Sequence, residues 1–152
     1  MMATNGQCSC KHVSFEMKAA PLSRVICHCT ICQSFNDAAY GDVAIFRAKD
    51  VVMPDESEVR YQAFTKPAIV HRGKCQSCEQ PVIEYVDLPL TPKLVIVPVA
   101  SIKDPSLVPD PAMHIFYHSR KNAIQDALPK YSGYLKSQMA LGMALIKGMF
   151  KA

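Results

Sequence analysis

Three thiols and one imidazole stand within six residues near the start of this chain, in the run Cys27-His28-Cys29-Thr30-Ile31-Cys32. The other cysteines also fall into close groups, so that all seven belong to one of three clusters: Cys8 with Cys10, Cys27 with Cys29 and Cys32, and Cys75 with Cys78. Zinc prefers thiolate ligands, and a complete set of internal disulfides cannot use an odd number of cysteines. The pattern therefore favours metal chemistry.

The seven cysteines divide into a closed set of four and an open set of three. A structural zinc takes four protein ligands, whereas a catalytic zinc takes three and leaves one position open. We therefore predict two Zn²⁺ per chain. The closed set would join the start of the chain to its middle, and the open set is where we expect the chemistry. The two predicted ligand sets are Cys8, Cys10, Cys75 and Cys78 for the structural zinc, and Cys27, Cys29 and Cys32 for the open site.

The spacings make these ligand sets feasible. The stretch from Cys75 to Cys78 has the two-residue gap of a zinc knuckle, in which a tight turn presents both sulfurs. Cys8 and Cys10 are two residues apart, as are the first two central cysteines, and an extended segment places such residues on one face. The same alternation predicts that His28 points away from the central site. Cys32 returns after two further residues, so three sulfurs can reach one ion.

Two other interpretations of the central cysteines stay open. Cys29 and Cys32 could form a redox pair, or the three thiols could be an incidental cluster. A redox Cys-x-x-Cys pair normally opens a helix within a βαβ unit, whereas this one lies among predicted strands. The remaining histidines are typical of surface or core positions rather than ligands: His12, His71, His114 and His118.

Short alternating stretches separated by turn signals predict a mainly β domain around these cysteines. Eleven prolines punctuate the chain and disfavour long helices in its middle. We expect strands at residues 13–17, 24–26, 40–46, 59–63, 68–72, 82–86, 94–99 and 114–117.

The last residues change to helical spacing, with an apolar stripe formed by Leu135, Met139, Met143, Ile146 and Phe150. We predict a zinc-binding domain over residues 1–134, followed by one amphipathic helix over residues 135–152. We expect this helix to pack on its own domain or on the second subunit of a homodimer. Three lysines are a thin polar face, so a membrane partner is not expected.

Composition fits one globular domain of 152 residues, of which 49% are hydrophobic and 20% charged. The sequence has no apolar run of about 18 residues and no features of a secretory signal, so we expect a cytoplasmic protein. The formal charge is +4; seven thiolates would subtract seven charges and two Zn²⁺ would add four, which leaves +1. The charge therefore does not favour a nucleic-acid partner.

The ordered cysteines resemble those of the glutathione-dependent formaldehyde-activating enzymes. The resemblance covers about residues 6–133, and the stretches that carry it are Gly6-x-Cys8-x-Cys10, Cys27-His28-Cys29-x-x-Cys32, Cys75-x-x-Cys78, and residues 97–105, 114–116 and 128–131. It implies a zinc-bound β-tent, a single domain of short stacked antiparallel sheets. It also implies that Cys27, Cys29 and Cys32 hold the catalytic zinc and that the other four cysteines hold the structural one.

The activity that the resemblance implies is formation of S-(hydroxymethyl)glutathione from glutathione and formaldehyde, a carbon–sulfur lyase reaction in reverse. The chain departs from the family at several places: Lys11 and Glu79 stand where many members have glycine, an Arg-rich stretch is missing after Cys32, and there is no tryptophan. A non-enzymatic zinc-binding interaction module, to which a likeness to centromere protein V points, is the alternative function. A thiol redox switch at Cys29 and Cys32 is the third.

Overall fold

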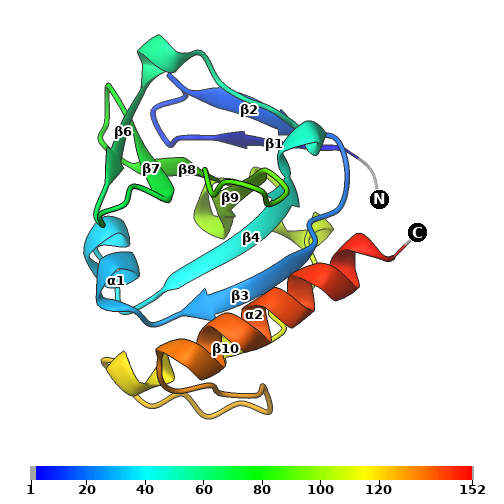
Figure 1. Cartoon of the computed structure of the whole chain (residues 1–152). Helices are drawn as coiled ribbons and strands as arrows, with labels where there is room; N and C mark the ends of the chain where they lie inside the picture. The colour runs from blue at the N-terminus through cyan, green and yellow to red at the C-terminus, as the bar shows by residue number, and fades with distance from the viewer. Residues whose placement is uncertain (1–2, 152) are drawn as a thin grey trace.

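Residues 3–151 are described by a computed structural model, and two β-sheets dominate it (Figure 1). The small sheet has the order β1-β2-β5, and the large sheet has the order β10-β3-β4-β9-β8-β7-β6. The strands are β1 (Thr4–Gln7), β2 (Ser14–Met17), β3 (Ser23–Cys27), β4 (Gly41–Arg47), β5 (Val51–Val52), β6 (Val59–Ala63), β7 (Val70–Cys75), β8 (Pro81–Val86), β9 (Leu94–Pro98) and β10 (His114–Ile115). The α-helices are α1 (Thr30–Asn36) and α2 (Tyr134–Met149).

The prediction of a mainly β fold with a C-terminal helix is confirmed. Each expected strand has a counterpart, with ends shifted by a few residues. The expectation of antiparallel pairing holds with one exception, because β10 runs parallel to β3 at the edge of the large sheet. Besides short 3-10 turns, two strands and one α-helix were not predicted: β1 and β5, which are short, and α1, which begins inside the central cysteine run.

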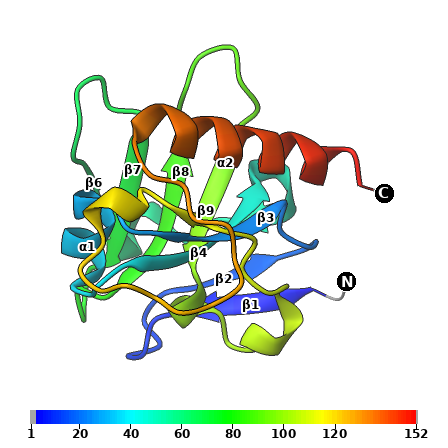
Figure 2. The same ribbon diagram turned by 90° about the horizontal axis from the view of Figure 1, so that it is seen from below.

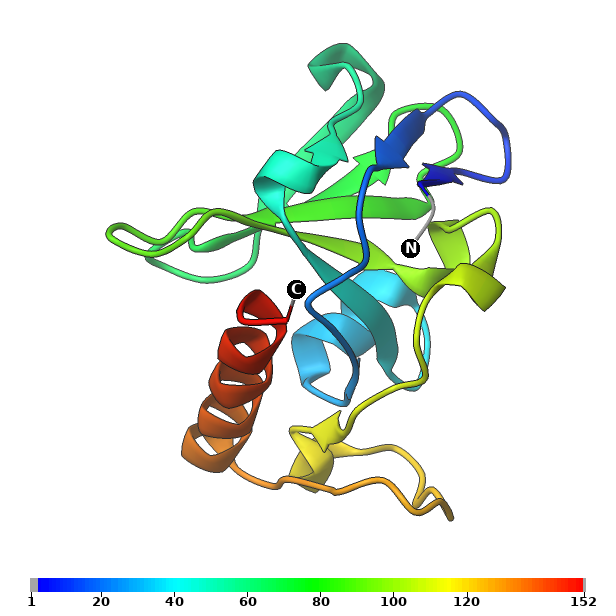
Figure 3. The same cartoon turned by 90° about the vertical axis from the view of Figure 1, so that its right-hand side faces the viewer.

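Both faces of the large sheet are covered, and the sequence of β4 reflects this. Val43 and Ile45 belong to one buried cluster, while Ala44 and Phe46 belong to another on the opposite face. A strand buried on both faces reads as a continuous apolar run instead of alternating. Figures 2 and 3 show the two covers, with β1 and β2 on one side of the large sheet and α2 on the other.

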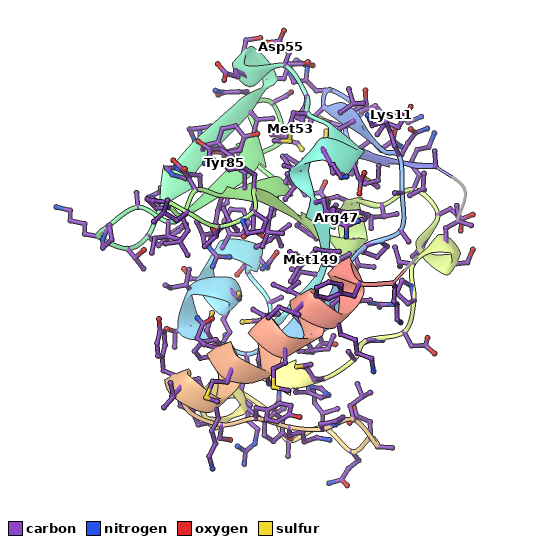
Figure 4. The ribbon with its side chains drawn as sticks, turned by 45° about the vertical axis from the view of Figure 1, so that its right-hand side comes forward. Lys11, Arg47, Met53, Asp55, Tyr85 and Met149 are labelled. Carbon is purple, nitrogen blue, oxygen red and sulfur yellow. The ribbon has the colours of Figure 1, made fainter. Side chains whose placement is uncertain are left out.

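Helix α2 packs on the large sheet through one face. The partly buried apolar residues of this face are Ala140, Leu141, Ala144 and Leu145, which contact the cluster that contains Cys27 and Cys32. The end of the helix is also held: Arg47 Nη2 donates to the carbonyl of Met149 at 2.6 Å, and Figure 4 shows the two residues side by side. A cation at a helix C-terminus satisfies carbonyl groups that lack intrahelical partners. The helix therefore covers the side of the sheet on which the central cysteines lie.

Candidate metal centre

The cysteines form two groups in space, as their spacing predicts. In each group all sulfur atoms lie within 4.8 Å of one another, and the groups are Cys8, Cys10, Cys75 and Cys78, and Cys27, Cys29 and Cys32. Bonds of about 2.3 Å to a tetrahedral ion place sulfurs about 3.8 Å apart. Both groups therefore have the donor atoms and the spacing that a zinc ion needs.

The four-cysteine group is built from two turns that face each other. Cys8 Sγ lies 3.2 Å from Cys10 Sγ and 3.6 Å from Cys75 Sγ. Backbone amides also point at the sulfurs: Val13 N donates to Cys8 Sγ at 3.3 Å, and Ser77 N donates to Cys75 Sγ at the same distance. Amides aimed at sulfur favour the thiolate form that a metal requires. The residues of this group fit a structural zinc.

The local conformation of the first pair differs from the prediction. Cys8 and Cys10 lie in the turn between β1 and β2, not on an extended segment. The turn is closed by Lys11, whose φ is 66°, and the second turn contains Glu79 with φ 61°. Glycine adopts this left-handed region without steric cost, whereas a residue with a Cβ does so rarely. Lys11 and Glu79 therefore hold a backbone conformation that glycine would adopt more readily.

The three-cysteine group lies where β3 ends and α1 begins. Cys27 is the last residue of β3, Cys29 caps the N-terminus of α1 by accepting from Cys32 N at 3.3 Å, and Cys32 lies in the first turn. Cys27 and Cys32 are buried, while Cys29 is partly exposed. The context is β-rich, as expected, but the pair opens the short helix α1, which was not expected and is typical of redox sites. However, β3 and β4 are antiparallel, so α1 does not belong to a parallel βαβ unit.

The three central thiols affect one another's ionisation, because their sulfur atoms lie within 4.8 Å of one another. Hydrogen bonds from Cys27 and Cys32 lower the pKa of Cys29, and the same contact with Cys29 raises the pKa of Cys27. The three thiols therefore do not ionise independently of one another. A bound cation would replace the shared protons and let all three act as thiolates.

A buried ion pair lies against this group. Arg72 on β7 and Glu84 on β8 are paired across the sheet, and Arg72 Nη1 donates to Glu84 Oε1 at 2.8 Å and to Cys32 Sγ at 3.7 Å. Glu84 is fully buried, and its Oε2 has no hydrogen-bond partner among the described residues. Burial raises the pKa of Glu84 to about 7, while Arg72 opposes the shift.

Neither member of this ion pair is evident from the sequence as part of the site, because Arg72 is 40 residues away from Cys32. One signal was available. Glu84 interrupts an otherwise apolar strand in the stretch 82–86, and a carboxylate in such a position is rarely buried without a partner.

His28 points away from the cysteines, as alternation predicts. Its Nε2 lies 2.8 Å from His114 Nδ1, and His114 Nε2 lies 2.7 Å from Asp126 Oδ2. Gln33 Nε2 donates to the carbonyl of His28 at 2.7 Å. Burial, with help from His114 and Arg120, lowers the pKa of His28 to about 4. His28 is therefore a neutral residue that ties the end of β3 to β10.

Two sulfur-lined sites on a mainly β fold define a candidate metal-binding protein of the zinc-bound β-tent class. The family model described as "Glutathione-dependent formaldehyde-activating enzyme" matches residues 3–119, and the chain belongs to this family. The fold is similar to that in a crystal structure of a Rhodobacter sphaeroides protein, a structural-genomics target, with a TM-score of 0.53 and 15% identity over 84% of this chain and 99% of that one. No curated protein matches the chain. Within residues 3–151, neither helix is long and apolar enough to span a membrane.

Proposed function

We propose that this protein adds glutathione or a related small thiol to formaldehyde, giving an S-(hydroxymethyl) adduct, and that it catalyses the reverse carbon–sulfur lyase reaction. Membership of the family supports this substrate class. The observation that carries the proposal is the group of Cys27, Cys29 and Cys32, to which the described residues add no fourth His, Cys, Asp or Glu ligand atom. A set of three ligands leaves a coordination position for a substrate.

Each cysteine group has its own role in this proposal. Residues 1–134 hold both ions, the four-cysteine group holds a structural Zn²⁺, and the central group holds a catalytic one. Bound Zn²⁺ supplies a Lewis-acidic position that keeps a thiol sulfur in its thiolate form. The seven unpaired cysteines suit a reducing compartment, and we place the protein in the cytoplasm.

The residues around the central group suit capture of a thiol more than activation of water. Three thiolates and one Zn²⁺ carry a net charge of −1, which weakens the acidity of a bound water and favours exchange between thiols. The Arg72 guanidinium, 3.7 Å from Cys32 Sγ, offsets this negative charge. Cys27 and Cys32 are buried and Cys29 is partly exposed, so a substrate thiol would approach past Cys29.

The test follows a ¹³C-formaldehyde label into the glutathione adduct by NMR exchange, with zinc-loaded wild-type protein and two matched variants. Cys32→Ser removes a ligand of the central group, and we expect it to abolish the acceleration over the uncatalysed reaction. Cys78→Ser removes a ligand of the other group, and we expect lower thermal stability with an adduct rate within about threefold of wild type. A wild-type protein that leaves the exchange rate unchanged would refute the proposal.

A redox function has one observation in its favour, the position of Cys29 at the N-cap of α1. A helix N-terminus lowers the pKa of a cysteine and makes it a better nucleophile. A redox switch predicts that mild oxidation joins Cys29 to Cys32 reversibly and releases one zinc per chain. Mass spectrometry of the alkylated protein, with zinc measured in parallel, separates this function from the lyase function.

A further inference from the structure

Arg72 lies in a protected position beside the central cysteines. Its side chain is only 12% exposed, and its guanidinium carbon lies 5.7 Å from the centre of the Phe35 ring. Glu84 anchors it from the neighbouring strand at 2.8 Å. A long flexible side chain held on two sides loses little further entropy when it binds a ligand. Arg72 is thus preorganised next to the sulfur atoms.

Two polar groups of this ion pair have no hydrogen-bond partner among residues 3–151. Every hydrogen bond that Arg72 donates to residues 3–151 leaves from Nη1, so its Nε–Nη2 edge has no protein partner. The buried Oε2 of Glu84 also has no hydrogen-bond partner among these residues. The Nε–Nη2 edge of an arginine is a planar fork with two N–H groups, which suits an anionic oxygen. Buried groups without partners are concentrated at functional sites, because elsewhere they only destabilise the protein.

We propose that Arg72 is a catalytic residue of the central site and that Glu84 is the positioning residue that holds it. The inference rests on the proposed function. When the thiolate sulfur attacks the aldehyde carbon, a C–S bond forms and the C=O π bond breaks. The π electron pair moves to the oxygen, which then takes a proton from water to give the hydroxymethyl group. The Nε–Nη2 edge donates to this oxygen while it is negative.

The electrostatics of the site favour this assignment. Thiolate sulfurs repel a developing oxygen anion, so the addition needs a cation close to them. Arg72 is a cation in contact with one of these sulfurs, Cys32 Sγ, while Lys74 lies 5.6 Å from the centre of the Phe35 ring. Removing one donor from such an anion typically lowers a rate about 100-fold to 1,000-fold.

The first test measures binding and does not depend on activity. Mercaptoacetate carries a thiol and a carboxylate, whereas mercaptoethanol carries a thiol and a neutral hydroxyl. We expect calorimetry to show that the zinc-loaded wild-type protein binds mercaptoacetate at least tenfold tighter, and that Arg72→Met binds both equally. Arg72→Lys should keep part of the preference. An unchanged preference in Arg72→Met, with zinc retained, would overturn the inference.

The second test measures the rate of adduct formation. We expect Arg72→Met to lower the rate about 100-fold while its affinity for glutathione changes less than threefold, and guanidinium ions added to the solution should restore part of the rate. Glu84→Gln should lower the rate by a smaller factor, about tenfold. Arg60→Met is the control, because Arg60 forms an exposed ion pair with Glu79 at 3.0 Å, and we expect no change.

The outcomes separate this inference from the proposed function. An active wild type and an equally active Arg72→Met would leave the function standing and overturn the role of Arg72. A wild type without activity would refute both the function and the catalytic role. Because a lone Glu84 charge can unfold the protein, the double variant Arg72→Met/Glu84→Met removes both charges together. We expect it to fold, to bind two zinc ions, and to lose rate as the single variant does.

The outer face of α2 carries a second, independent inference. Five large apolar residues form one line on the helix side opposite the packed face, and more than half of each side chain is exposed: Leu135, Met139, Met143, Ile146 and Phe150. Together they expose roughly 700 Å², close to the ~800 Å² that each partner contributes to a stable interface. We infer that this face pairs with the same face of a second copy, with the two helices antiparallel.

The charges of the helix fit this arrangement. Its charged residues are lysines, and an antiparallel pair centred near Met143 places Lys136 of one copy beside Phe150 of the other, so that lysines do not face each other. Each Met143 then lies near the Met143 of the partner copy, because a two-fold interface is self-complementary.

Light scattering of the eluted full-length protein tests the pairing. We expect a dimer for wild type and for the control Gln125→Glu, whose exposed residue lies outside the helix. Met143→Glu places two like charges together at the two-fold axis and should give a monomer. At about 50–100 μM protein, a dimer with a micromolar dissociation constant would be mostly formed. A wild type that stays monomeric at this concentration would overturn the inference. So would binding of that monomer to anionic vesicles, which would assign the face to a membrane surface.

Discussion

Two glycines of α2 provide a matched test of how the helix is seated. Among residues 3–151, a Cβ at Gly142 would meet no other atom within 4 Å. A Cβ at Gly148 would overlap the backbone carbonyl of Leu22, whose carbon and Cα would lie 2.9 Å away. Glycine in an exposed helix interior costs about 1 kcal/mol relative to alanine. Gly142→Ala should therefore raise the free energy of unfolding by about 1 kcal/mol.

Gly148→Ala gains the same helix propensity but must move the helix away from Leu22. Overpacking of this kind costs about 1–3 kcal/mol, and the shift would also strain the hydrogen bond between Arg47 and Met149. We expect a net loss of about 1–2 kcal/mol, so the two substitutions should have opposite signs.

Urea unfolding of both variants at one protein concentration, followed by circular dichroism, measures the difference. For a chain of this size, 1 kcal/mol corresponds to roughly 2–4 °C in the melting temperature. Equal stabilisation by both alanines would refute the reasoning, because it would mean that α2 does not rest on the backbone at Leu22.

Three further predictions concern the metal sites and their support. Cys75→Ser should reduce bound zinc from two ions per chain to one and lower the melting temperature, as measured by metal analysis and calorimetry. Burial raises the pKa of Glu84 to about 7 in the folded protein, above its unfolded value of 4.5. Between about pH 4.5 and 7 the folded state therefore keeps a proton on Glu84 that the unfolded state has lost. The folded protein loses about 3 kcal/mol of stability as the pH rises through this window. Glu84→Gln should remove this loss, and parallel pH profiles of the two proteins would contradict it. Gly73→Ala should destabilise by about 2 kcal/mol or more, because its Cβ would lie 2.7 Å from the carbonyl oxygen of Ile83. An unfolding free energy equal to wild type would show that β7 and β8 do not approach so closely.

The grouping of the cysteines is the part of this protein that its sequence predicts best. Spacing alone predicts which cysteines meet, because the geometry of a zinc ion restricts the combinations. The alternation through Cys27, His28 and Cys29 predicts on which side the imidazole lies, and the structure confirms it. The strands are also predictable, because short alternating or continuous apolar runs between turn signals are typical of β-strands.

The other parts of the central site depend on contacts between distant residues, which the local sequence does not encode. Helix α1 is seven residues long and capped by a cysteine thiol in place of a usual capping residue, so its start signal is weak. The approach of Arg72 to Cys32 depends on the register between β7 and β8, which a single strand does not reveal. Residues that complete a site from distant strands therefore become evident only in the folded chain.

The central claim is that Cys27, Cys29 and Cys32 hold a metal ion with a position open to a thiol. Calorimetric titration of glutathione into zinc-loaded wild-type protein and into Cys32→Ser tests it most directly. We predict saturable binding of one glutathione per chain to wild type, and its loss in a Cys32→Ser variant that remains folded with one zinc ion. Equal binding to both proteins, or no binding to the wild type, would contradict the claim.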